Sequence, residues 1–234
     1  MSLIIGVYVS TGIVISGDSR TTGIIQQQVP NPQVAGQNIT VQTNINLSDS
    51  TEKVFKLFDY FGLATFGDAH INNLPIAYYV EQFEAVNNLV PPATTLDLVT
   101  LLLKYFRQLN PNLRTGLIVG GFDKNTPNIY VVDIFGNTST RQNIIADTQT
   151  IQYGIIRGGD TDIANRLLDN QQLLPAFDVM SLQDAVDFSR HLIRTTIDHM
   201  RFEPKFPTVG GEIDTLVITK KSVDFLQHKS IKCV

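Results

Sequence analysis

The stretch LIIGVYVSTGIVISGDSRTT (residues 3–22) contains two apolar, β-branched runs separated by a short turn. The runs at Leu3–Val9 and Ile13–Ser16 have the composition and length of strands, and Ser10-Thr11-Gly12 has the composition of a turn. The first strand is expected almost at residue one, although chain termini usually fray. The sequence therefore predicts an N-terminal hairpin and indicates that the N-terminus needs a fixed position.

A charged pair follows the second of these strands directly. Asp18 and Arg20 come immediately after an apolar run. Taken alone, the pair is typical of a turn in which the carboxylate binds backbone N–H groups and the arginine extends into solvent. A role in chemistry requires partners elsewhere in the chain.

Composition excludes several classes of protein. The 234 residues are 43% hydrophobic and 17% charged, which is enough apolar material for one domain with a sizeable core. The net charge of −4 argues against a nucleic-acid partner. Apolar runs such as Leu101–Leu103 are far shorter than the ~20 residues that span a bilayer, so no membrane partner is expected. The N-terminus lacks the pattern of a signal peptide, so a cytoplasmic location is expected.

Neither a metal nor another cofactor is expected. Cys233 is the only cysteine, which excludes an internal disulfide and a cysteine-rich metal site. Asp187, His191 and His199 share a helix face, but the two histidines are two turns apart and cannot reach one zinc ion at ~2 Å. A solvated or packed face is the simpler interpretation. The Gly-Gly pairs at 120–121 and 158–159 lack the spacing of a phosphate-binding loop.

A polar tract follows the charged pair. No charged residue occurs from Thr21 to Ser48, and ten of these 28 residues are Asn or Gln. Such a tract predicts an inserted loop or an extended hairpin, at about residues 21–50. No repeat or linker divides the rest of the chain, so residues 1–234 are interpreted as one domain.

Further elements are expected in the order strands, two helices, strands, two helices, strands. Val54–Thr65 predicts two strands, and a helical stretch is expected from Gly67-Asp68-Ala69 to about Asn88, before the break at Pro91-Pro92. The remaining predictions are a helix capped at Thr94 or Thr95 and running to Leu109, strands at Thr115–Phe122, Ile129–Phe135, Thr138–Ile145 and Ile151–Ile156, helices from near Asp160 and from Ser181, and strands at Glu212–Thr219 and Val223–Gln227. This grouping predicts an α+β fold in which helices cover two antiparallel sheets.

The segment GIVISGDSRTT (residues 12–22) resembles the signature of proteasome β-type subunits and their bacterial relatives, which are N-terminal nucleophile hydrolases. Ser2 lies sixteen residues before Asp18, at the position of the family's catalytic threonine. Lys53 precedes an apolar strand, as the family's catalytic lysine does, and Gly67 lies fourteen residues further on, at the position of its oxyanion glycine. Later segments agree more loosely, at 119–133, 180–185 and 210–211. The resemblance implies a four-layer αββα sandwich of two antiparallel sheets.

The resemblance also implies a mechanism and partners. After removal of Met1, the α-amino group of Ser2, with a pKa of about 7.7–8.0, would activate the Ser2 hydroxyl. Lys53, held by Asp18, would keep that amine neutral, and the Gly67 N–H would stabilise the oxyanion. The implied substrate is a peptide or unfolded protein, and the implied assembly is a homo-oligomeric ring that an ATP-driven unfoldase can feed.

Supporting and pocket residues follow from the same alignment. The family pattern has serine at the positions of Gly159 and Val209, and its supporting aspartate falls on Phe206; with an insertion at 201–207, Asp198 and Thr208 would substitute. Arg20 is a further supporting residue. Thr21, Phe55, Thr65 and Ala69 would form a small-to-medium apolar pocket. Two alternatives stay open: a catalytically inactive scaffold or ring subunit, and an amide hydrolase (acylase) for small molecules.

Overall fold

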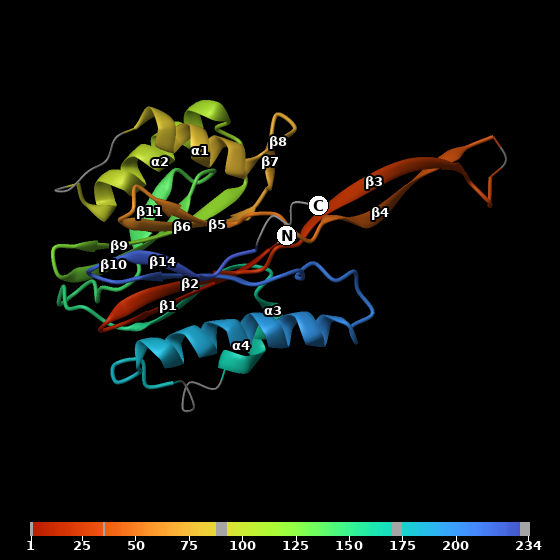
Figure 1. Cartoon of the computed structure of the whole chain (residues 1–234). Coiled ribbons are helices and arrows are strands. Elements are labelled where there is room, and N and C mark those ends of the chain that lie inside the picture. The colour runs from red at the N-terminus through yellow and green to blue at the C-terminus, as the bar shows by residue number, and fades with distance from the viewer. Residues whose placement is uncertain (1, 35, 88–92, 170–174, 230–234) are drawn as a thin grey trace, which may run out of the picture.

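The computed structural model describes residues 2–34, 36–87, 93–169 and 175–229, so Met1, Pro91-Pro92 and Cys233 lie outside the described residues. Two five-stranded antiparallel sheets form the centre of the molecule (Figure 1). In spatial order the first sheet contains β12 (Gly154–Gly159), β1 (Leu3–Val9), β2 (Gly12–Gly17), β13 (Asp214–Ile218) and β14 (Val223–Gln227).

The second sheet contains, in spatial order, β11 (Thr138–Arg141), β10 (Thr126–Asp133), β9 (Thr115–Asp123), β6 (Phe61–Gly67) and β5 (Val54–Leu57). Helices α1 (Ile76–Val86) and α2 (Thr95–Leu109) cover its outer face, whereas α3 (Asp162–Leu168) and α4 (Leu182–Met200) cover the outer face of the first sheet (Figure 1). This α+β arrangement is compatible with the expected sandwich.

Alternation along β1 shows why the sheets stack. Leu3, Ile5 and Val7 belong to the core between the first sheet and its helices. Ile4 and Tyr8 belong to the core between the two sheets. Because successive side chains of a strand point to opposite faces, a run that is apolar at every position can be buried on both. The first hairpin therefore forms an interior layer.

The polar tract forms a long hairpin of β3 (Thr21–Pro30) and β4 (Asn38–Ser48), which pair antiparallel. It extends away from the two sheets as a two-stranded arm (Figure 1). Of the two alternatives for this tract, the extended hairpin is confirmed. We call residues 21–48 the arm.

Most predicted boundaries lie within three residues of the structure, but one element was predicted wrongly. No helix begins at Gly67-Asp68-Ala69; instead β7 (His70–Ile71) and β8 (Leu74–Pro75) form a small hairpin before α1. Its turn residues Asn72 and Asn73 have φ of 50° and 64°. Two consecutive positive φ angles are typical of a tight hairpin turn, and asparagine adopts them readily.

The second helix agrees with its prediction. Thr94 is the N-cap of α2, its side chain accepts a hydrogen bond from the Asp97 N–H, and the Asp97 carboxylate accepts from the Thr94 N–H. This reciprocal capping box satisfies two of the N–H groups that a helix start leaves unpaired.

Candidate active site

Asp18 is the most heavily hydrogen-bonded carboxylate at the edge of the first hairpin. Its Oδ1 accepts from the Leu3 N–H at 2.9 Å and from the Lys53 ammonium at 2.8 Å. Its Oδ2 accepts from the N–H groups of Arg20 at 3.1 Å and Gly210 at 3.0 Å. The carboxylate thus does bind backbone N–H groups, as the structural interpretation expected, but it also holds a lysine from a distant segment.

The Asp18–Lys53 pair is buried. The two side chains are 0% and 4% exposed, and Lys53 Nζ also donates to the Arg20 carbonyl. Burial lowers the pKa of Lys53 from its usual value, and the charge and hydrogen bond of Asp18 oppose that effect. The ammonium therefore loses its proton more readily than that of a free lysine, while remaining held in one position.

Arg20 does not extend freely into solvent. Its guanidinium donates from Nε and Nη2 to Asp49, at 2.6 and 2.9 Å, and from Nη1 to the Pro207 carbonyl at 3.3 Å. The hydrogen bonds that Arg20 donates to Asp49 raise the pKa of Arg20 above its usual value. Because residues 20 and 49 flank the arm, this bidentate pair closes its base.

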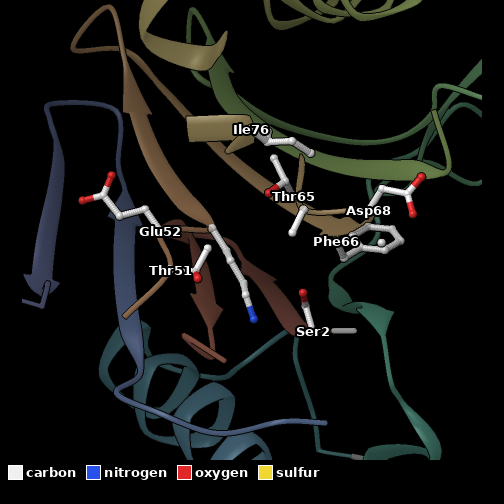
Figure 2. A pocket seen from close by; sticks show the side chains of 10 residues that line it. Ser2, Thr51, Glu52, Thr65, Phe66, Asp68 and Ile76 are labelled. Carbon is white, nitrogen blue, oxygen red and sulfur yellow. The ribbon is translucent and has the colours of Figure 1, made fainter. Parts of the chain in front are cut away.

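Three of the expected catalytic residues line one pocket. Ser2, Lys53 and Gly67 come from three separate segments and meet there (Figure 2). In Figure 2 the Ser2 side chain points into the pocket. The other lining residues are Thr51, Glu52, Thr65, Phe66, Asp68, Ala69 and Ile76. The expected pocket residues Thr65 and Ala69 are thus brought to Ser2.

Gly67 ends β6 with a φ of +105°, and a Cβ there would overlap the Arg114 carbonyl. Both observations require glycine at this position. After it the chain runs along the pocket wall, where the Asp68 N–H donates to the same Arg114 carbonyl at 3.1 Å. The unusual conformation of Gly67 thus shapes the wall opposite Ser2.

Gly159 is fixed by its contact with Ser2. It pairs with Leu3 across β12 and β1, has a φ of +93°, and a Cβ there would overlap the Ser2 carbonyl. The Asp160 N–H donates to that carbonyl at 2.6 Å. A serine side chain, which the family pattern has at position 159, has no room in this arrangement.

Sequence reasoning named Thr208 but missed its partner beside Ser2, Asp160. The Thr208 hydroxyl donates to the Asp160 carboxylate, and Thr208 is buried. Asp198, the expected substitute for the family's supporting aspartate, lies instead on the exposed side of α4. A signal was available, because Asp160 follows a strand that ends in glycine, as Asp18 does.

Two expected pocket residues lie elsewhere. Phe55 packs in the core between the second sheet and its helices and does not line the Ser2 pocket. Thr21 donates its hydroxyl to Thr51 at 2.7 Å and lines a neighbouring cavity of about 490 Å³ at the base of the arm. The two cavities share residues 67–69.

A second, partly buried cation lies against the first sheet. Lys229 pairs through its ammonium with Asp214, whose side chain is 1% exposed, and its N–H donates to the same carboxylate at 2.8 Å. Asp214 is the register partner of Gly17. Burial lowers the pKa of Lys229 to about 8, and the charge of Lys53 adds to that effect.

The described residues show neither a metal-binding cluster nor a membrane-spanning helix. Within the described ranges, no three His, Cys, Asp or Glu side chains gather in a way that could hold a metal ion. Asp187 and His191 are exposed on α4, in agreement with a solvated face. None of the described helices combines the length and apolar character needed to cross a bilayer.

Comparison with protein-family models and with curated proteins gives no match to this chain.

Proposed function

We propose that the chain is a proteasome-like N-terminal nucleophile hydrolase that cleaves peptide bonds through Ser2 after removal of Met1. The observation that carries the proposal is the buried Asp18–Lys53 pair, which adjoins a pocket shared by Ser2 and Gly67. The layered arrangement of helices and sheets supports the same family.

Burial of the Asp18–Lys53 ion pair costs free energy, so the pair is explained better by a functional role than by a contribution to stability. Removing two charges from water costs several kcal/mol per ion even after relaxation, and a hydrophobic pair of similar volume is often as stable. Residues with shifted pKa values that lie in a cleft are candidates for chemistry. Lys53 meets both criteria, since its pKa is lowered and it lines the pocket.

The first half of the reaction forms an ester. Hydrolysis of the Met1–Ser2 bond converts an amide nitrogen, which is not basic, into a free amine. That amine takes the proton of the Ser2 hydroxyl as Oγ attacks the carbonyl carbon of the substrate. The Lys53 ammonium keeps the amine neutral by charge repulsion, and the Gly67 N–H binds the oxyanion. The C–N bond then breaks, and the leaving nitrogen takes the proton from the amine.

The second half consumes water. The Ser2 amine takes a proton from water, and the oxygen of the resulting hydroxide attacks the carbonyl carbon of the ester. The bond to Oγ breaks, Oγ regains a proton, and the carboxylic acid leaves. Nucleophile, base and oxyanion donor all belong to the chain, so the reaction needs only the peptide and water.

Asp160 and Thr208 would complete the site. Asp160 is joined to Ser2 through the hydrogen bond to the Ser2 carbonyl, and its carboxylate is held by Thr208. We assign this pair the supporting role that the family alignment predicts for Asp198 and Thr208, with Asp160 in place of Asp198. Asp160 would favour a fixed position of residue 2 relative to Lys53.

The proposal is tested by intact mass before and after treatment with a peptide epoxyketone, a reagent that needs a hydroxyl and a free adjacent amine to form its ring. We expect loss of Met1 and one adduct on Ser2. Ser2→Ala should prevent the adduct, whereas Ser50→Ala, at an exposed serine that precedes the pocket residue Thr51, should leave it unchanged. Retained Met1 with no adduct, or peptidase activity that survives Ser2→Ala, would contradict the proposal.

Assembly is the second part of the proposal. The arm carries no charge and exposes several apolar side chains: Ile24, Ile25, Val41 and Leu47. Isolated two-stranded hairpins are marginally stable in water, and a protruding uncharged hairpin with open strand edges favours pairing with another chain. We propose that the arm contributes to a homo-oligomeric assembly. Mass photometry of the parent and of an arm-shortened variant tests this directly.

A further inference from the structure

The pocket that contains Ser2 is very small. The volume open to the centre of a water molecule is about 10 Å³, which corresponds to room for roughly one water. Any substrate carbonyl attacked by Ser2 Oγ and bound by the Gly67 N–H must direct its own side chain into this space or its immediate surroundings. The volume of the pocket therefore limits the size of that substrate side chain.

The floor and one wall of the pocket are buried and anchored. Ile76, the first residue of α1, is 3% exposed, and its N–H donates to the Ala69 carbonyl at 3.0 Å. Thr65 is 5% exposed, and its N–H donates to the Lys53 carbonyl at 2.9 Å. Figure 2 shows both side chains directed toward the pocket from the side opposite Ser2. These bonds fix the backbone of both residues, and the burial of both side chains leaves them little free space around the pocket.

The aromatic wall is enclosed as well. The Phe66 ring occupies space left by Gly116 on β9 and Gly158 on β12, where a Cβ at either position would overlap the ring. The ring is thus held between two strands, one from each sheet. A larger substrate side chain would have to displace a packed ring, and overpacking of well-packed regions is destabilising.

We propose that the residue whose carbonyl Ser2 attacks carries a side chain no larger than that of alanine or serine, and that Ile76 sets this limit. The inference rests on the proposed function and makes it more specific. It also departs from the small-to-medium pocket expected from sequence, because Phe55 is withdrawn into the core and Ile76 closes the space instead.

The neighbouring cavity provides a contrast. It measures about 490 Å³, is bounded by Leu47 of the arm and by His70, and adjoins the small pocket at Gly67. The restriction therefore applies to the residue at the cleavage point, whereas residues further along the substrate have room. Peptides that differ only at the cleavage point isolate the effect.

The experiment uses N-blocked tripeptide amides of a fluorescent amine that vary only in the last residue: Gly, Ala, Ser, Val, Leu or Phe. For the parent we expect kcat/KM for alanine to exceed that for leucine by at least tenfold, since one misfitting methylene alone changes the rate by ~10–200-fold. Ile76→Ala should raise the leucine-to-alanine ratio at least tenfold, and Ile76→Val should raise it less while disturbing the core little.

Val80→Ala is the matched control, because Val80 is buried on the same helix and does not line the pocket. It should leave the ratio unchanged. A parent that cleaves after leucine or phenylalanine as fast as after alanine would overturn this inference and leave the proposed function standing. Absence of hydrolysis of every peptide, together with no epoxyketone adduct, would overturn both.

Discussion

β1–β2 and β3–β4 are consecutive antiparallel hairpins whose strands contain no charged residue, yet every strand residue of the first is buried and most strand residues of the second are exposed. The first is apolar at nearly every position, so both of its faces can pack. In the second hairpin, apolar and polar residues do not alternate regularly. The neighbours Ile24 and Ile25 point to opposite faces and are 62% and 41% exposed. Absence of charge therefore does not lead to burial; an apolar face does.

The carboxylates that follow the two hairpins repeat the contrast. Asp18 comes directly after β2, is 0% exposed in its side chain and accepts four hydrogen bonds. Asp49 comes directly after β4, is 43% exposed and pairs with Arg20. An aspartate directly after a hairpin is thus buried and accepts four hydrogen bonds in one case, whereas in the other it is exposed and pairs with one arginine.

The largest expected effect comes from removing these charges in turn. Asp18→Asn leaves the buried Lys53 ammonium without its counter-ion, and breaking a buried pair costs ~3–5 kcal/mol. Asp49→Asn weakens an exposed pair and should cost less than ~1 kcal/mol. Urea unfolding of both variants measures the difference. Equal losses would mean that the burial of Asp18 contributes nothing to its importance.

Core packing gives the next largest effect. Ile15→Ala in β2 removes a side chain that is 0% exposed in the core between the sheets, and should cost ~2–5 kcal/mol of unfolding free energy. Ile24→Ala in β3 makes the same chemical change at an exposed position and should change stability by no more than ~0.5 kcal/mol. Thermal unfolding of the pair at one protein concentration provides the comparison. A large loss at Ile24 would show that the arm is covered in solution.

Local signals in the sequence were sufficient for the first hairpin, the Thr94 cap and the limits of β14. They failed at Gly67, where a glycine before an acidic residue was interpreted as a helix start. The tight turn at Asn72-Asn73 makes this region a hairpin, and the two consecutive asparagines are the local signal for that turn. β12 also begins at Gly154 rather than at Ile151, which makes only an isolated bridge with Ile144.

The candidate site also contains residues that local sequence indicates and contacts that it does not. Asp18 could be singled out from its own surroundings, because a charge after an apolar strand needs an explanation. Its pairing with Lys53, 35 residues away, was expected only through the family resemblance. The Asp160–Thr208 bond joins residues 48 apart. No spacing rule within this chain specifies such a bond, because it depends on where β12 ends relative to Ser2.

The partly buried Lys229, which pairs with Asp214 of β13, should make stability depend on pH. Lys229 has a pKa of about 8 in the folded chain and about 10.4 when unfolded. Between these values the unfolded chain binds more protons, so the free energy of unfolding rises with pH. Below pH 8 the charged Lys229 ammonium destabilises the folded chain by its full amount, and this destabilisation decreases as pH rises toward 10.

Lys229→Met lacks this titration, so the parent should gain stability relative to this variant from pH 7.5 to 10, by on the order of 2 kcal/mol. Unfolding in urea at several pH values measures the difference. Lys221→Met, which removes an exposed positive charge, controls for the change in net charge. The opposite slope would show that the Asp214 carboxylate outweighs burial and raises the pKa of Lys229.

The smallest expected effect on stability belongs to the arm. Replacing residues 24–44 by Asn-Gly keeps the pairs Gly23–Ile45 and Thr22–Asn46 and supplies a turn suited to a two-residue hairpin. Because the removed strands are largely exposed, the free energy of unfolding of the dilute protein should change by less than ~1 kcal/mol. If the arm joins copies of the chain, association stabilises the parent by mass action, so its Tm rises with concentration. The Tm of the shortened chain should not, and identical concentration dependence in both would exclude the arm as the site of assembly.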